Sequence, residues 1–174
     1  DLDEEQCDWA HDMSVHGPTS VEILKKEGIE DPVLFDAIKA HNPKCGMKAK
    51  TNLQYAVLAA DPMSGFIKAV AQIYPDKKIA SVKHKSVIKR FNESRFAKGA
   101  NRDYMEMIEF TGLSLDDLID IALEEMGAIA DVLGLLYPFS SIVFKIGSVI
   151  FNSLNVIYYY FAVRQNSIYF HYLI

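Results

Sequence analysis

Cysteine is scarce in this sequence. Cys7 and Cys45 are the only two in 174 residues, and they form neither a CxxC pair nor a disulfide framework. A chain of this size does not need disulfides, so we expect packing roles for both and a reducing, cytoplasmic compartment. We also expect no secretory signal, because Asp-Leu-Asp-Glu-Glu is the reverse of a basic segment followed by an apolar run. No methionine opens the chain, so we expect native sequence upstream.

Strand patterns are lacking as well. No run of alternating β-branched residues occurs before residue 142, and no internal repeat is present. The length and the half-hydrophobic composition favour one globular domain, over residues 1–134. Caps and apolar periodicity predict a helical fold throughout that domain. The predicted helices run from Pro18 to Gly28, from Pro32 to His41, from Thr51 to Asp61, over 63–74 and 82–91, from Asn101 to Gly112, and from Ser114 to Gly134.

Acidic residues are absent from the last 43 residues, which contain only two basic ones. Residues 142–163 are long enough to cross a bilayer, although Lys145, Asn152 and Asn155 make a poor span. We keep three interpretations of this apolar tail, residues 135–174. It is a C-terminal membrane anchor, an additional buried hairpin or helix, or a chain end that is not the natural end of the domain.

Charge is unevenly distributed along the rest of the chain. The net charge of −5 argues against a general nucleic-acid binder. Residues 1–36 nevertheless contain eleven acids and two lysines, whereas residues 68–102 contain ten lysines and arginines and two acids. The basic segment is either a solvated helix face or, for a few residues, a rim that faces the phosphate of a substrate. The residues that we select for the second role are Lys77, Lys78, Lys85 and Arg102.

Two histidines and an aspartate carry the chemistry that the sequence suggests. His16, His41 and Asp61 each lie at or beside a predicted helix end, so they could point into one space between helices. Histidine nitrogen and carboxylate oxygen suit a divalent metal such as Mn, Fe, Zn, Ni or Co. The competing interpretation is that each histidine is a capping or surface residue. We expect His84 and His171 to be structural, and His11-Asp12 to be solvated.

The order of several short motifs resembles the HD-domain hydrolases, specifically the HDIG-type group of metal-dependent phosphohydrolases. The motifs that carry this resemblance, over roughly residues 1–134, are Asp1-Leu-Asp3, His16-Gly17, Ala40-His41-Asn42, Ala59-Ala60-Asp61, Pro75-Asp76-Lys77-Lys78, Val82-Lys83-His84-Lys85-Ser86-Val87, Phe96-Ala-Lys-Gly and Gly112-Leu-Ser-Leu. The resemblance implies an all-α, HD-domain-like helical bundle. It also implies that Asp1, His16, His41 and Asp61 are metal ligands and that Asp1 is catalytic. The family's first histidine and the histidine of its His-Asp dyad would precede Asp1. We therefore expect a domain without its first helix and with an incomplete metal site.

The function that the resemblance implies is hydrolysis of a nucleotide or another small phosphoester. A divalent metal, Mn, Fe, Ni, Co, Zn or Mg, would activate the attacking water. No specific nucleic-acid partner is expected. The alternative hypothesis, from a different class, is a non-catalytic helical binding or regulatory module that the tail holds at a membrane.

Overall fold

The structure is a computed structural model that describes residues 2–3, 8, 11–131 and 133. Within these residues the chain forms helices and no strand, which confirms the all-α prediction for this part. The helices are α1 (Pro18–Lys26), α2 (Pro32–Ala40), η1 (Pro43–Cys45), α3 (Asn52–Gln72), η2 (Ile79–Ser81), α4 (His84–Phe91), α5 (Arg102–Glu106), η3 (Met107–Thr111) and α6 (Leu115–Ala128). None of the helices described is long and apolar enough to span a bilayer. The predicted span at 142–163 lies outside the described residues.

Local capping signals set most helix starts. The Asp31 carboxylate accepts the backbone N–H groups of Val33 and Leu34 at 2.9 and 3.1 Å, and Pro32 follows it at the first helical position. Thr51 forms the predicted capping box with Gln54 at the start of α3. Ser114 forms another with Asp117 at the start of α6. Backbone N–H groups at these helix starts have no partner within the helix. They donate instead to the capping side chains that the sequence predicted.

The observed length of helix α3 differs from the prediction. We predicted that a helix ends at Asp61 and that a separate helix covers 63–74, and the residue before a proline is in general disfavoured in the helical conformation. In the structure α3 continues through Pro62 to Gln72. Its apolar residues on both sides of Pro62, such as Leu58, Met63 and Phe66, are fully buried. Burial of these side chains outweighs the cost of a proline within a helix, which is about 3 kcal/mol. Helix α6 also differs, since it ends at Ala128 rather than at Gly134.

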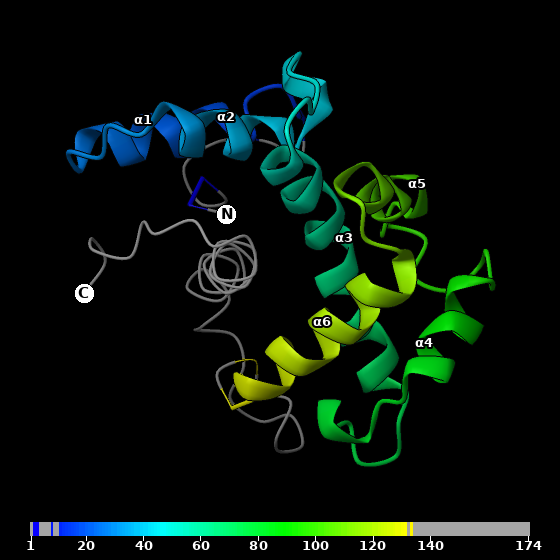
Figure 1. The fold of residues 1–174 in the computed structure, drawn as a ribbon. Coiled ribbons are helices and arrows are strands. Elements are labelled where there is room, and N and C mark those ends of the chain that lie inside the picture. The colour runs from blue at the N-terminus through cyan, green and yellow to red at the C-terminus, as the bar shows by residue number, and fades with distance from the viewer. Residues whose placement is uncertain (1, 4–7, 9–10, 132, 134–174) are drawn as a thin grey trace.

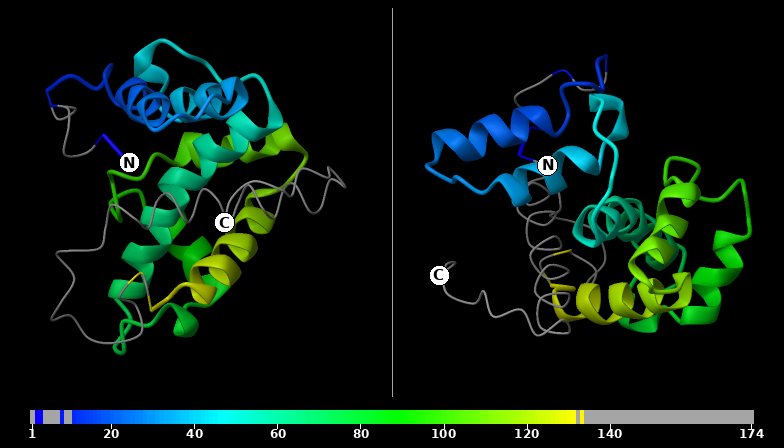
Figure 2. Two further views of the ribbon diagram at one scale, coloured as in Figure 1. Left: turned by 90° about the vertical axis from the view of Figure 1, so that its left-hand side faces the viewer. Right: turned by 45° about the horizontal axis from the view of Figure 1, so that its top comes forward.

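Helix α3 is the axis of the fold (Figure 1). Helices α1 and α2 lie beside each other at its N-terminal end and share a small core of Val21, Leu24 and Phe35. Helices α4, α5 and α6 cover its other sides around the main core. The loop between α3 and α4 lies at the opposite end of α3 from α1 and α2, as both Figure 1 and the left view of Figure 2 show. The two ends of α3 are therefore built from different parts of the chain.

His84 joins α4 to α6. Its Nδ1 lies 2.6 Å from Asp120 Oδ1, and its Nε2 lies 2.7 Å from Asp116 Oδ1. The two carboxylates are one helical turn apart on α6, so one ring can reach both. Hydrogen bonding to Asp120, assisted by Asp116 and opposed by partial burial, raises the pKa of His84. His84 thus has the structural role that we expected.

Candidate functional site: two convergent histidines

His16 and His41 meet although 25 residues separate them in the chain. His16 lies in the turn before α1, and His41 is the C-cap of α2. Their Nε2 atoms are 2.9 Å apart, and the rings are close to perpendicular, with centroids 4.7 Å apart. The structure therefore brings together two of the four predicted metal ligands.

Asp3 contacts the ring nitrogen of His16 that does not face His41. The Asp3 side chain is fully buried, and its Oδ1 lies 3.2 Å from His16 Nδ1. Its Oδ2 accepts the backbone N–H of Gly17 at 2.7 Å. Burial favours the neutral acid, but the Gly17 hydrogen bond and the nearby His16 outweigh it and lower the pKa of Asp3. Asp3 is therefore an ionised carboxylate at neutral pH.

These contacts fix the proton positions on both rings. An ionised carboxylate only accepts hydrogen bonds, so Nδ1 of His16 must carry a proton. Nδ1 of His41 faces the backbone carbonyl of Ile38, which also only accepts, so this nitrogen carries a proton too. Burial, the strongest influence, lowers the pKa of His41 although the Asp61 carboxylate acts to raise it. His41 is therefore neutral, and its Nε2 offers a lone pair to Nε2 of His16.

Gly17 and Asn42 determine how closely the two histidines approach. Gly17 has φ +92°, and a Cβ at this position would lie 3.2 Å from the Ile38 carbonyl oxygen and 3.5 Å from Cε1 of His41. Asn42 is buried, and its Nδ2 donates to the carbonyl oxygens of Met13 and His16 at 2.6 and 2.9 Å. The turn that carries His16 is thereby tied to the end of α2.

Of the other two predicted ligands, Asp61 and Asp1, only Asp61 is among the described residues. Asp61, in the middle of α3, lies near enough to His41 for its charge to influence that ring. Asp1 is outside the described residues. Among the residues that the structure describes, no group of three or more His, Cys, Asp or Glu side chains is arranged to hold a metal ion. The described part of the candidate centre is thus the histidine pair, its Asp3 support and the neighbouring Asp61.

His11 and Asp12 do not join this group. The His11 side chain is 85% exposed and bonds to Asp8, while Asp12 accepts the backbone N–H and the hydroxyl of Ser14. This confirms that the adjacent pair is solvated. A local turn fully accounts for the contacts of Asp12.

The predicted phosphate-binding lysines do not lie beside the histidines. Eleven residues of α3, from Pro62 to Gln72, follow Asp61 before the helix ends, a rise of about 16 Å. Lys77 and Lys78 come after that end, and Lys85 lies in the first turn of α4. Helix α4 packs against α3 near Phe66, which points about 140° away from Asp61 around the helix axis. The prediction of a lysine rim at the metal site is therefore corrected.

Arg102 is also corrected, because its guanidinium is occupied by the fold. It donates to the carbonyl oxygens of Phe91 at 2.8 Å, Phe96 at 2.7 Å and Glu93 at 3.1 Å, with longer contacts to Arg90 and Ala100. The same group lies over the rings of Phe66 and Phe91, 5.1 and 5.6 Å from their centroids. Arg102 holds the loop after α4 against the core through these contacts.

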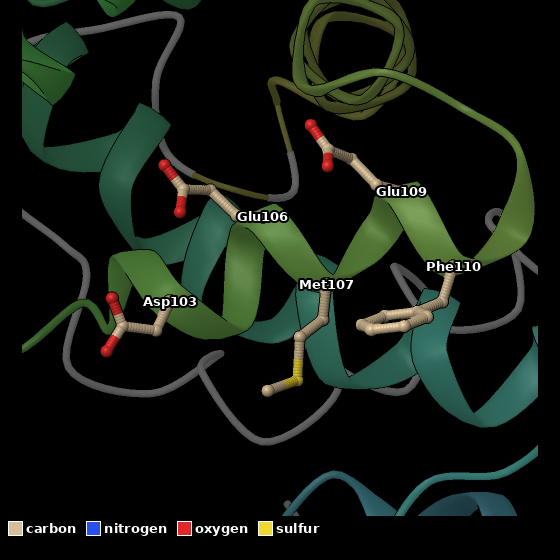
Figure 3. A pocket seen from close by; sticks show the side chains of 5 residues that line it. All are labelled: Asp103, Glu106, Met107, Glu109 and Phe110. Carbon is tan, nitrogen blue, oxygen red and sulfur yellow. The ribbon is translucent and has the colours of Figure 1, made fainter.

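A surface depression of about 380 Å³ lies on α5 and η3. Its lining residues are Asp103, Glu106, Met107, Glu109 and Phe110 (Figure 3). Phe110 is two-thirds exposed and stacks on Tyr55 of α3, with ring centroids 4.7 Å apart. None of the predicted site residues lines this depression.

Sequence reasoning missed Asp3 and Asn42 as supports of the site. Asp3 stands in the same Asp-Leu-Asp motif as Asp1, and only the fold shows that it contacts His16. Asn42 gave a local signal, because asparagine before proline often caps a turn, and it does cap η1. Its contacts to Met13 and His16 are long-range, so that signal could not reveal them.

Comparisons with family models, with curated proteins and with solved structures gave no match to this chain.

Proposed function

We propose that this protein is an HD-domain-like, metal-dependent phosphohydrolase whose metal centre includes His16 and His41. The substrate would be a nucleotide or another small phosphoester. The observation that carries the proposal is the approach of two histidine Nε2 atoms to 2.9 Å while both Nδ1 atoms are held by acceptors. The order of the sequence motifs supplies the reaction class.

The proton positions support a cation between the rings. Nε2 of His41 carries a lone pair. Nε2 of His16 faces this lone pair either with a proton or, where the His16 ring is neutral, with a second lone pair. Two facing lone pairs would both be available to bind a divalent cation. Two ring nitrogens that bind one metal at about 2.1 Å and at right angles are about 3.0 Å apart. The observed separation fits that arrangement.

The chain's own residues have separate tasks in this proposal. Asp3 orients His16 and keeps its metal-facing nitrogen deprotonated, as a carboxylate commonly does for a metal-bound histidine. The Ile38 carbonyl does the same for His41. Asp61 and Asp1 would add carboxylate ligands. A bound divalent metal would supply positive charge for the phosphoester and lower the pKa of the attacking water.

Metal content tests this proposal most directly. The full chain is incubated with Mn²⁺, freed of excess metal and analysed for its elements. We expect bound manganese, and we expect its loss in His16→Ala and His41→Ala. His84→Ala is the matched control, since it removes a histidine that also bonds to aspartate but has both nitrogens occupied. It should retain the metal.

Hydrolysis is then measured with Mn²⁺ across a panel of nucleotides and simple phosphoesters. Activity that His41→Ala abolishes and His84→Ala preserves would support the proposal. Equal metal loss in all three variants would contradict the assigned centre. A wild-type protein that binds no metal and hydrolyses no phosphoester would instead favour the non-catalytic binding module.

A further inference from the structure

Five exposed lysines form a surface that the histidine centre does not use. Lys77 and Lys78 lie in the turn after α3, Lys83 precedes α4, and Lys85 and Lys89 lie one helical turn apart on α4. We call these residues the basic strip. Arg95 and Lys98 continue it as exposed cations in the next loop.

The positive charge of this strip is compensated only in part, since Asp76 lies close enough to Lys78 for their charges to interact. Within the part of the chain that the structure describes, none of these five lysines forms an ion pair. The two acids of residues 68–102 have other partners. Asp76 accepts the Ser81 hydroxyl at 2.6 Å, and Glu93 pairs with Arg90 at 2.5 Å. The strip is therefore available to an anionic ligand.

The backbone also holds part of the strip in an unusual conformation. Lys77 has φ +52°, which costs a non-glycine residue about 1–2 kcal/mol. Glycine or asparagine would satisfy this turn with less strain. The chain instead keeps a lysine at this position, beside a second lysine. Such a residue is expected where its side chain has a role.

We propose that the basic strip binds the phosphodiester backbone of a nucleic acid without regard to base sequence. Lys85 and Lys89 are about 6 Å apart along the helix, a spacing that suits a regularly charged polymer. Exposed aromatic side chains, which would stack on bases, are not among the residues of the strip. The contacts are therefore to phosphate. The net charge of −5 does not exclude such binding, because the acids are concentrated elsewhere in the chain.

The neighbouring acids favour a narrow ligand over a membrane surface. Asp116 and Asp120 of α6 bond to His84 of α4, so carboxylates lie beside the strip. A flat anionic bilayer would meet these carboxylates together with the lysines, within one Debye length of about 8–10 Å. A single strand or duplex can follow the lysines alone.

The experiment measures binding of the full chain to a short fluorescent single strand and to a duplex by anisotropy, between about 50 and 200 mM salt. The test variant is the double substitution Lys85→Glu and Lys89→Glu. Its control is Lys48→Glu with Lys50→Glu, which changes the net charge equally at two exposed lysines outside the strip. Thermal unfolding verifies that both variants are folded, as expected for exposed side chains.

We expect binding that weakens with salt and falls at least about tenfold in the strip variant but less than about threefold in the control. The slope of log K against log salt should become shallower by about 1.4–1.8, because two phosphate contacts are lost. Equal weakening in both variants, or no binding at the lowest salt, would overturn the proposal. So would binding only to vesicles of equal parts phosphatidylcholine and phosphatidylserine. Metal content is independent of these outcomes, so failure here leaves the hydrolase proposal standing.

Discussion

His16 and His84 both bond to aspartates, but in opposite ways. His16 uses one nitrogen for a fully buried carboxylate, Asp3, and turns the other toward His41. His84 uses both nitrogens, for Asp116 and Asp120, whose side chains are 70% and 69% exposed. The first arrangement directs one ring nitrogen of each histidine toward the other. The second uses the whole ring to join two helices.

The difference shows that a histidine beside an aspartate is not by itself a metal ligand. What decides is whether one ring nitrogen remains directed at a second ligand, and whether the carboxylate is buried enough to hold the ring in place. A carboxylate behind a histidine fixes its orientation only when the carboxylate itself is anchored. Asp3 is anchored by Gly17, whereas Asp116 and Asp120 lie on an exposed helix face.

The largest expected effect comes from crowding the turn of His16 against the end of α2. Gly17→Ala should lower the free energy of unfolding by about 2–4 kcal/mol, since it adds both a strained φ and a tight contact of 3.2 Å with the Ile38 carbonyl oxygen. Gly28→Ala is the control, because Gly28 has φ +84° but no atom within 4 Å of an added Cβ. It should cost only about 1–2 kcal/mol. Urea unfolding measures both. Equal costs would mean that the close approach at Gly17 is unimportant.

The next largest effect distinguishes the carboxylate beside His16 from a carboxylate beside His84. Asp3→Asn should weaken Mn²⁺ binding about 10- to 100-fold, because the single amide oxygen of asparagine cannot accept both the Gly17 N–H and the proton on Nδ1 of His16. Asp120→Asn, the corresponding change beside His84, should leave manganese affinity unchanged. Titration followed by calorimetry measures both affinities. Similar affinities in the two variants would remove the distinction between the two arrangements.

The smallest effect is the pH dependence that His84 contributes. Its pKa is raised in the folded protein, so its stabilising contribution is complete below the unfolded pKa of about 6.5 and is lost as the pH rises through the folded pKa. Because the carboxylates are exposed, we expect less than about 1 kcal/mol. The difference in unfolding free energy between wild type and His84→Gln should therefore shrink with rising pH. The double variant Asp116→Asn and Asp120→Asn should abolish this trend, and a trend that persists would assign it to other groups.

The sequence predicted the features that depend on a few adjacent residues. The caps at Asp31, Thr51 and Ser114 are confirmed because a side chain and its backbone partners lie within three residues. The end predicted at Asp61 was wrong because the packing of both halves of α3 into one core decides that helix's length. Neighbouring residues do not encode such packing.

The candidate site likewise combines features that the sequence predicted with features that only the fold shows. The approach of His16 and His41 was expected from their positions at predicted helix ends, whereas the support from Asp3 needed the fold. The lysines were misplaced because a basic segment gives charge but not position. A 21-residue helix carries its two ends about 30 Å apart, so residues close in sequence to one end can be remote from the other.

The contacts of Arg102 have a consequence for the order of events during synthesis. Five carbonyl oxygens, from residues 90 to 100, share this one guanidinium. All five emerge from the ribosome before their common partner does. The hydrogen bonds that hold the loop after α4 can therefore form only after Arg102 has been added to the chain.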